Sequence, residues 1–336
     1  LQMKVKLEQI AKKSGYSVAT VSRVLSGKAK GRSHSVTDIL MTARDLGFKT
    51  SSVNYKNLSL PLDIALITQH DAEEFYSCLY ESFDRISFEK NIHISIHSAK
   101  YSKNIQEQVL LLSKYNDGII LMAPTLDKTE YKDIIKKISS FPLISIAPVE
   151  GNIVPAITFD SYEGGRLAAE LFVDTGYSKF GIITGPSEKL EANLRRNGFQ
   201  DFLRKNKFKI NWEFQGDYSF KSGEKAFKDL QRKQKKNLAI FSSNDQMALG
   251  FLHATSEKGF KIPGDYGIVG YDNMPYSKVF YPKLSTINTD LDLLAINTLD
   301  FIVQKIKSSN DISVNPTTTL LPVELIKRRT HANEKL

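Results

Sequence analysis

From Asp63 onward, short apolar segments alternate with segments whose apolar residues recur at helical spacing. Repeated strand-then-helix units of this kind predict parallel sheets with helices on both faces. In chain order the strand-like segments read DIALIT, IHISIHS, GIILMAP, PLISIA, AITFD, FGIITG, LAIFSSN and YGIVGYD. Because about 270 residues are too many for one sheet, we expect two α/β lobes, each a doubly wound parallel sheet.

The first 48 residues predict three short helices instead. The first ends at Gly15, the second begins after an N-cap at Ser17, and the third runs from about Ser33 or Ser35 to Leu46. Two helices joined through a Gly-containing turn and followed by a third make a helix-turn-helix module. Its inward-facing residues are expected to be Leu7, Ile10, Ala11, Val21, Val24 and Leu25.

Positive charge is concentrated in the same part of the chain. Residues 1–60 hold 11 of the 46 Lys and Arg but only 3 of the 37 Asp and Glu, so they account for +8 of the net +9. This asymmetry indicates a nucleic acid or another acidic surface as the partner of that segment alone. A solvated basic tail is the alternative, but here the charges interrupt apolar residues at helical spacing.

The second helix leaves Val18, Ala19, Ser22 and Arg23 opposite its apolar stripe, with Thr20 near its N-terminus. A recognition helix needs such a face, because its N-terminal half reaches base edges while hydroxyl and amide groups hold phosphates. Arg can bond guanine bidentately, and small apolar side chains can touch a thymine methyl. An ordinary surface helix is the alternative, although longer charged side chains would then be usual.

Asn244 and Asp272 follow strand-like segments directly, and ligands of open parallel sheets gather outside those strand ends. Together with Arg they could bond a polyhydroxylated ligand. Each could instead be a helix N-cap.

Several other classes of site and protein lack support. Neither a dinucleotide fingerprint nor a phosphate-binding loop is present, so the glycines of YEGG are expected to serve close helix–strand packing. His93 and His97 share a strand face without further metal ligands. A lone Cys78, the absence of a signal peptide and the lack of an 18-residue apolar run predict a cytoplasmic protein outside the membrane. No cofactor and no catalysis are expected.

The segment VKLEQIAKKSGYSVATVSRVLSG resembles the N-terminal signature of the LacI/GalR family of bacterial transcription regulators. The resemblance continues through FDSYEGGRLAAEL, LRRNGFQDFL, FSSNDQMALGFL, GIVGYDN and LSTINTD. It implies an all-α headpiece at 4–48, a hinge at 49–61 and a core at 62–330 of periplasmic-binding-protein type I architecture. Within this core, lobe one is expected at about 62–158 and 287–315, and lobe two at about 159–286 and 316–330.

The resemblance also implies two sets of site residues. The effector, expected between the lobes, would contact His70, Phe75, Tyr76, Asp160, Glu163, Arg195, Tyr218, Phe220, Asn244 and Asp272, with the aromatic rings stacking on a sugar. The DNA-binding set would comprise Leu7, Ser17, Val18, Ala19, Thr20, Ser22, Arg23, Lys28, Arg32, Tyr55 and Leu58. The hinge departs from the family pattern, because Asn57 occupies the place of the leucine that wedges into the minor groove. Leu58, one residue later, or Tyr55 is expected to take that part.

These features predict a homodimeric (or tetrameric) repressor of a carbohydrate-utilisation operon. It would bind double-stranded operator DNA under the control of a sugar or sugar phosphate. The headpiece and the FKTSS segment resemble family members that govern β-galactoside use, and this resemblance implies a galactoside. Alternatives are control by a phosphorylated protein partner or a purine, a sugar-binding transport protein, and a sugar-processing enzyme.

Overall fold

The computed structural model describes residues 6–26, 28–29, 34–46, 48, 61–69, 74–99, 104–138, 141–233, 237–308 and 316–332. The chain divides into two compact units. Unit 1 comprises Leu1–Ile157 and Asp292–Thr318, and unit 2 comprises Thr158–Leu291 and Thr319–Leu336. The chain therefore passes between the units three times, as the resemblance implied.

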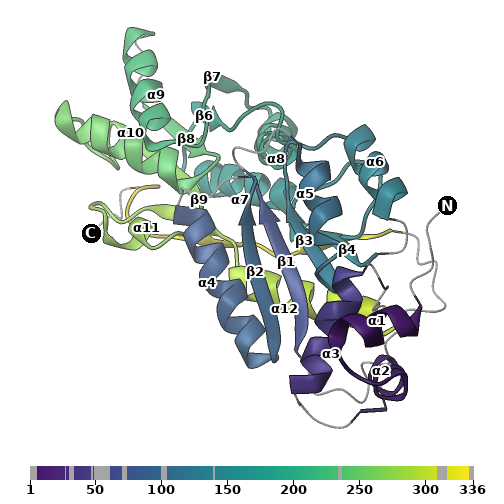
Figure 1. The fold of residues 1–336 in the computed structure, drawn as a ribbon. Coiled ribbons are helices and arrows are strands. Elements are labelled where there is room, and N and C mark those ends of the chain that lie inside the picture. Colours follow the sequence, from purple (N-terminus) through teal and green to yellow (C-terminus); the bar gives the residue numbers. More distant parts are fainter. Residues whose placement is uncertain are drawn as a thin grey trace. The chain divides into compact units, whose positions relative to one another are not determined.

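The headpiece consists of α1 (Leu7–Ser14), α2 (Val18–Leu25) and α3 (His34–Asp45), drawn in purple in Figure 1. Helix α1 ends at Gly15, which has a φ of 76° and therefore suits a residue without a side chain. The Ser17 side chain caps α2 by accepting a hydrogen bond from the Thr20 amide, as predicted. The three helices pack around Ile10, Ala11, Val21, Val24, Leu25, Ala29, Val36, Ile39, Leu40 and Ala43.

The first sheet has the strand order β11-β5-β4-β3-β1-β2. The strand pairs with an established register in this sheet are all parallel. Its elements are β1 (Leu62–Thr68), α4 (Glu74–Glu89), β2 (Ile92–Ser98), α5 (Ile105–Leu112), β3 (Gly118–Met122), α6 (Lys128–Ile138), β4 (Leu143–Ser145), β5 (Ala156–Phe159), α12 (Leu291–Lys307) and β11 (Thr318–Leu321).

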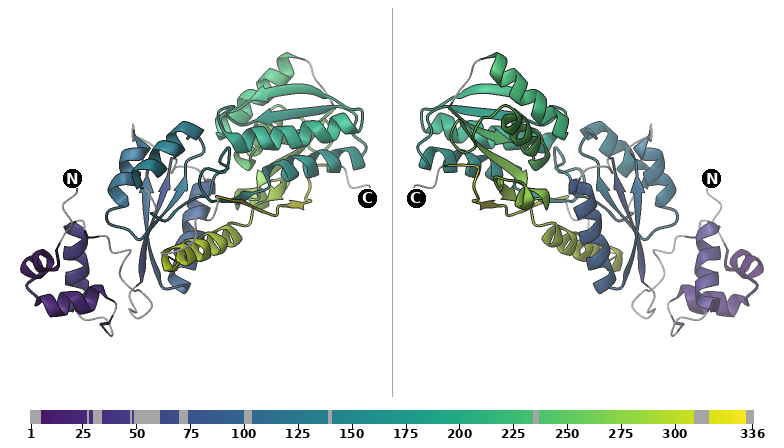
Figure 2. Two further views of the ribbon diagram at one scale, coloured as in Figure 1. Left: turned by 90° about the vertical axis from the view of Figure 1, so that its right-hand side faces the viewer. Right: turned by 90° about the vertical axis from the view of Figure 1, so that its left-hand side faces the viewer.

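Helices cover both faces of this sheet (Figure 2). One face packs against α5 and α6 through Val109, Tyr131 and Ile134. On the other face α12 approaches β3 so closely that a Cβ atom at Gly118 would lie 2.7 Å from Ile302. Ion pairs from Arg85 of α4 to Asp292 and from Lys90, just after α4, to Asp300 join this part of the chain to α12.

The second sheet repeats the first in strand order, β12-β10-β9-β8-β6-β7. It is parallel except for the antiparallel pair β10 and β12. Its elements are α7 (Ser161–Asp174), β6 (Phe180–Thr184), α8 (Leu190–Lys205), β7 (Ile210–Gln215), α9 (Phe220–Arg232), β8 (Leu238–Ser242), α10 (Asp245–Glu257), β9 (Tyr266–Asp272), α11 (Tyr276–Val279), β10 (Ser285–Asn288) and β12 (Glu324–Ile326).

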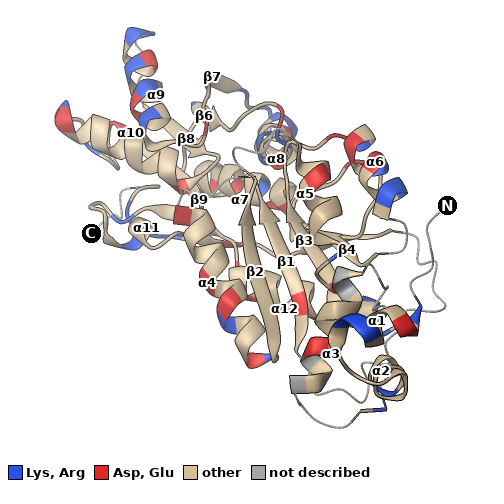
Figure 3. Cartoon of the chain, viewed as in Figure 1, with Lys and Arg blue, Asp and Glu red and all other residues tan. Residues whose placement is uncertain are grey.

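The side chains of successive residues in each strand of this sheet point to opposite faces. Ile182 packs with α7 and α8, whereas Ile183 packs with α9 and α10. Figure 3 shows that the outer surface of α9 carries charges of both signs, as expected for a solvated face. The sequence placed the return to lobe one at 287, but β10 pairs in register with β9, so the chain leaves unit 2 only after Leu291.

Candidate functional site

Helix α2 presents the polar face that the sequence predicted. Val21, Val24 and Leu25 are buried, whereas Val18, Ala19, Ser22 and Arg23 are exposed. In addition to accepting the hydrogen bond from the Thr20 amide, the Ser17 Oγ lies 2.9 Å from the Thr20 Oγ1. Exposure leaves the Arg23 guanidinium and the small side chains around it accessible to a partner.

Tyr16 orients this helix within the headpiece. Its hydroxyl donates a 2.9 Å hydrogen bond to Asp38 of α3, which ties the start of α2 to the next helix. That hydrogen bond is also the main reason why the pKa of Tyr16 is raised.

The remaining candidates for DNA contact have different surroundings. Leu7 is half-buried against the headpiece core, whereas Lys28 is exposed. Arg32, Tyr55 and Leu58 lie outside the described residues. Contact with DNA at all these positions stays a prediction.

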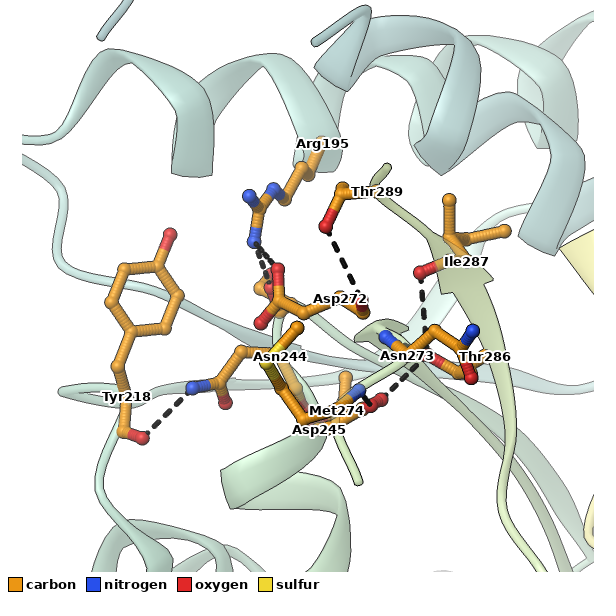
Figure 4. A network of polar contacts seen from close by, with 12 residues as sticks. Arg195, Tyr218, Asn244, Asp245, Asp272, Asn273, Met274, Thr286, Ile287 and Thr289 are labelled. Carbon is orange, nitrogen blue, oxygen red and sulfur yellow. Dashed lines mark hydrogen bonds and ion pairs between the residues drawn. The ribbon is translucent and has the colours of Figure 1, made fainter. Parts of the chain in front are cut away.

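Unit 2 brings four of the candidate effector residues together (Figure 4). Arg195 comes from α8, Asp272 ends β9, Asn244 follows β8, and Tyr218 precedes α9. The Arg195 Nη1 donates to the Ser243 carbonyl at 2.5 Å and lies 3.6 Å from the Asp272 Oδ1. The arginine and aspartate residues are only 8% and 6% exposed, so the pair is held inside the unit with little solvent.

The Arg195 guanidinium also lies over the Tyr271 ring, at 3.7 Å from its centroid. A cation at this distance is attracted by the negative face of the ring. Tyr271 therefore fixes the side chain on one side while Asp272 and Ser243 hold its end.

Both halves of the Asn244 amide already have partners within the protein. Its Oδ1 accepts from the Met247 amide at 2.9 Å, which makes it the N-cap of α10. Its Nδ2 donates to the Tyr218 carbonyl at 2.9 Å. The N-cap alternative is therefore correct for Asn244, and its direct effector contact stays a prediction.

Tyr218 is buried, with a φ of 71°. The ammonium of Lys189 lies 4.9 Å from the centroid of its ring, and its phenol end packs against Gly185. Burial raises the pKa of Tyr218 well above its usual range. Because a cation lies over its ring, less of the ring surface of Tyr218 is accessible for stacking on a sugar than the sequence suggested.

Five buried polar atoms around Arg195 lack a hydrogen-bond partner among the described residues. They are Glu191 Oε2, Arg195 Nε, Tyr218 OH, Ser243 Oγ and Tyr271 OH. Buried polar atoms are nearly always hydrogen-bonded in folded proteins, so such a group indicates a bound ligand or water. The set contains a carboxylate acceptor, an N–H donor and three hydroxyls that can do either.

Lys189, Glu191, Ser243 and Tyr271 belong to this group but were not predicted from the sequence. Two patterns in the sequence point to Glu191, Ser243 and Tyr271. Glu191 and Arg195 are four residues apart and so share a helix face. Ser243 and Tyr271 directly precede the two residues that were chosen at the strand ends.

Other candidates are engaged elsewhere. Asp160 caps α7 by accepting from the Glu163 amide, and the Glu163 carboxylate binds Arg166 at 2.7 Å. The Phe220 ring lies 5.6 Å from that of His253. In unit 1, Tyr76 is buried and packs edge-on against Phe75, whereas His70 lies outside the described residues.

The histidines and glycines that the sequence did not assign to a metal or nucleotide site also have defined partners. His93 pairs with Asp63, His97 lies 3.0 Å from the Ser95 hydroxyl, and no group of three metal ligands occurs in the described part of the chain. Of the YEGG glycines, Gly164 faces Tyr271 of β9, as expected, but Gly165 meets the backbone of α8. Among the described helices, none has the length and apolarity to cross a bilayer.

Comparisons with known proteins agree with this architecture. Residues 169–331 match the model of the periplasmic binding protein-like domain family. The repressor PurR of Klebsiella pneumoniae is 25% identical over 97% of both chains. Catabolite control protein A of Priestia megaterium is 27% identical over 85% of this chain and 87% of its own. A Lac repressor dimer bound to operator and the anti-inducer ONPF has 25% identity and a TM-score of 0.74, and covers 98% of this chain and 99% of its own.

Proposed function

Because the chain belongs to the LacI/GalR family of bacterial transcription regulators, we propose that it represses a carbohydrate-utilisation operon and is released from DNA by a saccharide. The relatives named above are regulators rather than enzymes, which supports a binding function. The resemblance to an operator-bound dimer supports two copies on a near-palindromic site, with α2 of each copy in the major groove.

The single observation that carries the effector proposal is the group of unsatisfied buried atoms around Arg195. A ligand for this group must both donate and accept hydrogen bonds, because the group presents both a carboxylate oxygen and an N–H. Adjacent hydroxyls of a sugar meet that requirement. The Asp272 carboxylate already lies 3.6 Å from Arg195 in a buried setting, which disfavours a second anion there and favours an uncharged sugar over a sugar phosphate.

A ligand can release DNA only if it binds the DNA-free state more tightly than the DNA-bound state. Binding at Arg195 and Asp272 would meet this condition if these side chains are arranged differently in the two states. Substitution of either residue should then remove the response to the saccharide while leaving operator binding intact.

A thermal-shift screen tests the effector class. A ligand at 100 times its dissociation constant stabilises the folded protein by about 2.7 kcal/mol, which is readily detected. We expect a shift with neutral saccharides, galactosides among them, and none with their phosphates. A shift with purine bases alone would favour the purine alternative. The absence of any shift, together with release from DNA by a phosphorylated protein, would favour the protein-partner alternative.

A further inference from the structure

The turn that follows β9 has an unusual backbone. Asp272 has a φ of 109° and Asn273 a φ of 59°, so two consecutive residues with side chains adopt positive φ. Side chains disfavour this region, and Asp272 lies well outside the small left-handed well that asparagine tolerates. Such a conformation persists only where surrounding contacts determine it.

Asp245 supplies the contacts to both residues that follow Asp272 (Figure 4). Its Oδ2 accepts from the Met274 amide at 2.9 Å, and its Oδ1 accepts from the Thr286 hydroxyl at 2.6 Å. The Thr286 oxygen in turn accepts from the Asn273 amide at 3.3 Å. One carboxylate therefore holds two successive amides, one directly and one through Thr286.

The surroundings are shaped to admit this carboxylate. Asp245 is 1% exposed, and a Cβ atom at Gly270 would come within 2.2 Å of its Oδ1. Burial raises the pKa of Asp245 well above its ordinary value, and the nearby Asp272 raises it further. Arg328 lies close enough to oppose that rise, and Thr286 and Met274 oppose it through their hydrogen bonds.

The turn has supports on its other side as well. The Thr289 hydroxyl donates to the Asp272 carbonyl at 3.2 Å, and the Asn273 Nδ2 donates to Asn288 at 2.8 Å. The Arg328 Nη2 donates to the Asn273 Oδ1. These contacts hold the carbonyl of Asp272 and the side chain of Asn273, whereas Asp245 and Thr286 hold the amides.

We propose that Asp245 is a positioning residue of the effector site, which holds the turn Asp272–Met274 so that the Asp272 carboxylate faces Arg195. Asp245 does not itself bind the effector. The inference rests on the proposed function, because it assigns Asp272 and Arg195 to the effector. The proposal adds that Asp245 influences the affinity for the effector indirectly. Its carboxylate contacts the backbone of the turn and Thr286.

Two variants test the proposal in the full-length chain. Asp245→Asn keeps the size of the side chain but replaces one acceptor oxygen by a donor, so one of the two contacts is lost. Thr286→Val removes the hydroxyl that relays the contact to Asn273. Thr255→Val is the matched control, because Thr255 is equally buried in unit 2 but donates to the Leu252 carbonyl within α10.

Three measurements are made on each variant. Hydrogen exchange reports on the amides of Asn273 and Met274, and calorimetry with lactose and a band shift with operator report on the two affinities. Both test variants should exchange these amides faster and bind lactose about tenfold or more weakly, while operator affinity stays at the wild-type value. The control should leave all three unchanged.

Three results would overturn the proposal. The first is unchanged exchange at the turn in both variants, and the second is faster exchange with wild-type affinity for lactose. Equal losses of lactose and operator affinity would also overturn it, since they would indicate a general loss of folding. If the wild-type chain fails to bind lactose, the galactoside assignment fails instead, and exchange at the turn still decides whether Asp245 holds it.

Discussion

At the scale of single residues, two arginines occupy opposite environments. Arg23 is exposed on α2, where its guanidinium can meet a partner, whereas Arg195 is buried between Tyr271, Asp272 and the Ser243 carbonyl. An exposed arginine can read a base or a phosphate, whereas a buried one must be paired. The contrast is consistent with the proposal that Arg23 recognises DNA and that Arg195 holds the effector.

Arg23→Ala should reduce the preference for operator over random DNA. The loss of a bidentate contact with guanine costs about 1–3 kcal/mol of discrimination. Competition band shifts measure this ratio. Lys12→Ala is the control, because Lys12 is exposed on α1 and its loss removes one positive charge without changing α2. If Arg23→Ala weakened binding to both DNAs equally, Arg23 would contact only phosphate.

Glu191→Gln should change how stability depends on pH. Burial raises the pKa of Glu191 in the folded state, while Arg195 and Lys189 partly oppose the rise. The folded protein then holds the proton more tightly than the unfolded chain, so the free energy of unfolding falls as pH rises above about 4.3 toward the folded pKa.

The glutamine variant lacks this slope and should gain stability relative to wild type over that interval. Thermal unfolding from acidic to neutral pH, with the exposed Glu188→Gln as control, checks the difference. Parallel profiles for wild type and Glu191→Gln would show that the carboxyl group is not desolvated in solution.

At the scale of secondary-structure elements, unit 2 contains two helix pairs that meet at glycines. A Cβ atom at Gly165 or Gly198 would lie about 2 Å from a backbone oxygen of the opposite helix in the α7–α8 pair. In the α9–α10 pair, a Cβ atom at Gly223 or Gly250 would likewise lie about 2 Å from a backbone oxygen of the opposite helix. Helix α8 carries Arg195, α9 begins two residues after Tyr218, and α10 begins directly after Asn244, so these close contacts set the positions of the candidate site residues.

Gly198→Ala should destabilise unit 2. The added methyl group would approach the Tyr162 carbonyl oxygen to 1.9 Å, so the helices must separate. Overpacking of this kind costs about 1–3 kcal/mol. Denaturant unfolding measures the cost, and Asn197→Ala, an exposed change at the adjacent position, serves as the control. Equal midpoints for the two variants would contradict the close packing.

Much of this arrangement could be predicted from the sequence. The apolar segments around Ile64, Ile182 and Ile268 predicted strands because parallel strands are buried on both faces. Ser17, Asn244 and Asp272 were placed correctly at helix starts and a strand end, since local patterns determine such positions.

The interior of the candidate site could not be predicted in the same way. Two contacts within the site join residues that are about 29 positions apart in the sequence. Lys189 contacts the Tyr218 ring, and Asp245 accepts a hydrogen bond from the Met274 amide. Periodicity reports which face of an element is buried, but not which side chain meets it from another element. The YEGG glycines show the same limit, because only the structure separates the strand-facing Gly164 from the helix-facing Gly165.

At the scale of the whole molecule, the headpiece segment differs from the rest of the chain in its charge and its fold. The headpiece segment carries nearly all of the excess positive charge, and the two sheets share one strand order. Positive charge attracts any DNA through counterion release, and we propose that the outward residues of α2 determine the sequence preference.

The logarithm of the operator affinity should therefore fall linearly with the logarithm of salt concentration, and that of the affinity for random DNA should fall similarly. Fluorescence anisotropy at a series of salt concentrations measures both slopes. A DNA affinity that did not change with salt would contradict the assignment of the basic segment to phosphate contacts.

The most direct test of the account is a band shift at moderate salt with a near-palindromic operator, with and without lactose. Wild-type protein should bind this DNA in preference to random DNA and release it when lactose is added. Arg195→Ala should bind equally well and fail to release. Equal binding to operator and random DNA would contradict the account, as would full release of the Arg195→Ala variant by lactose.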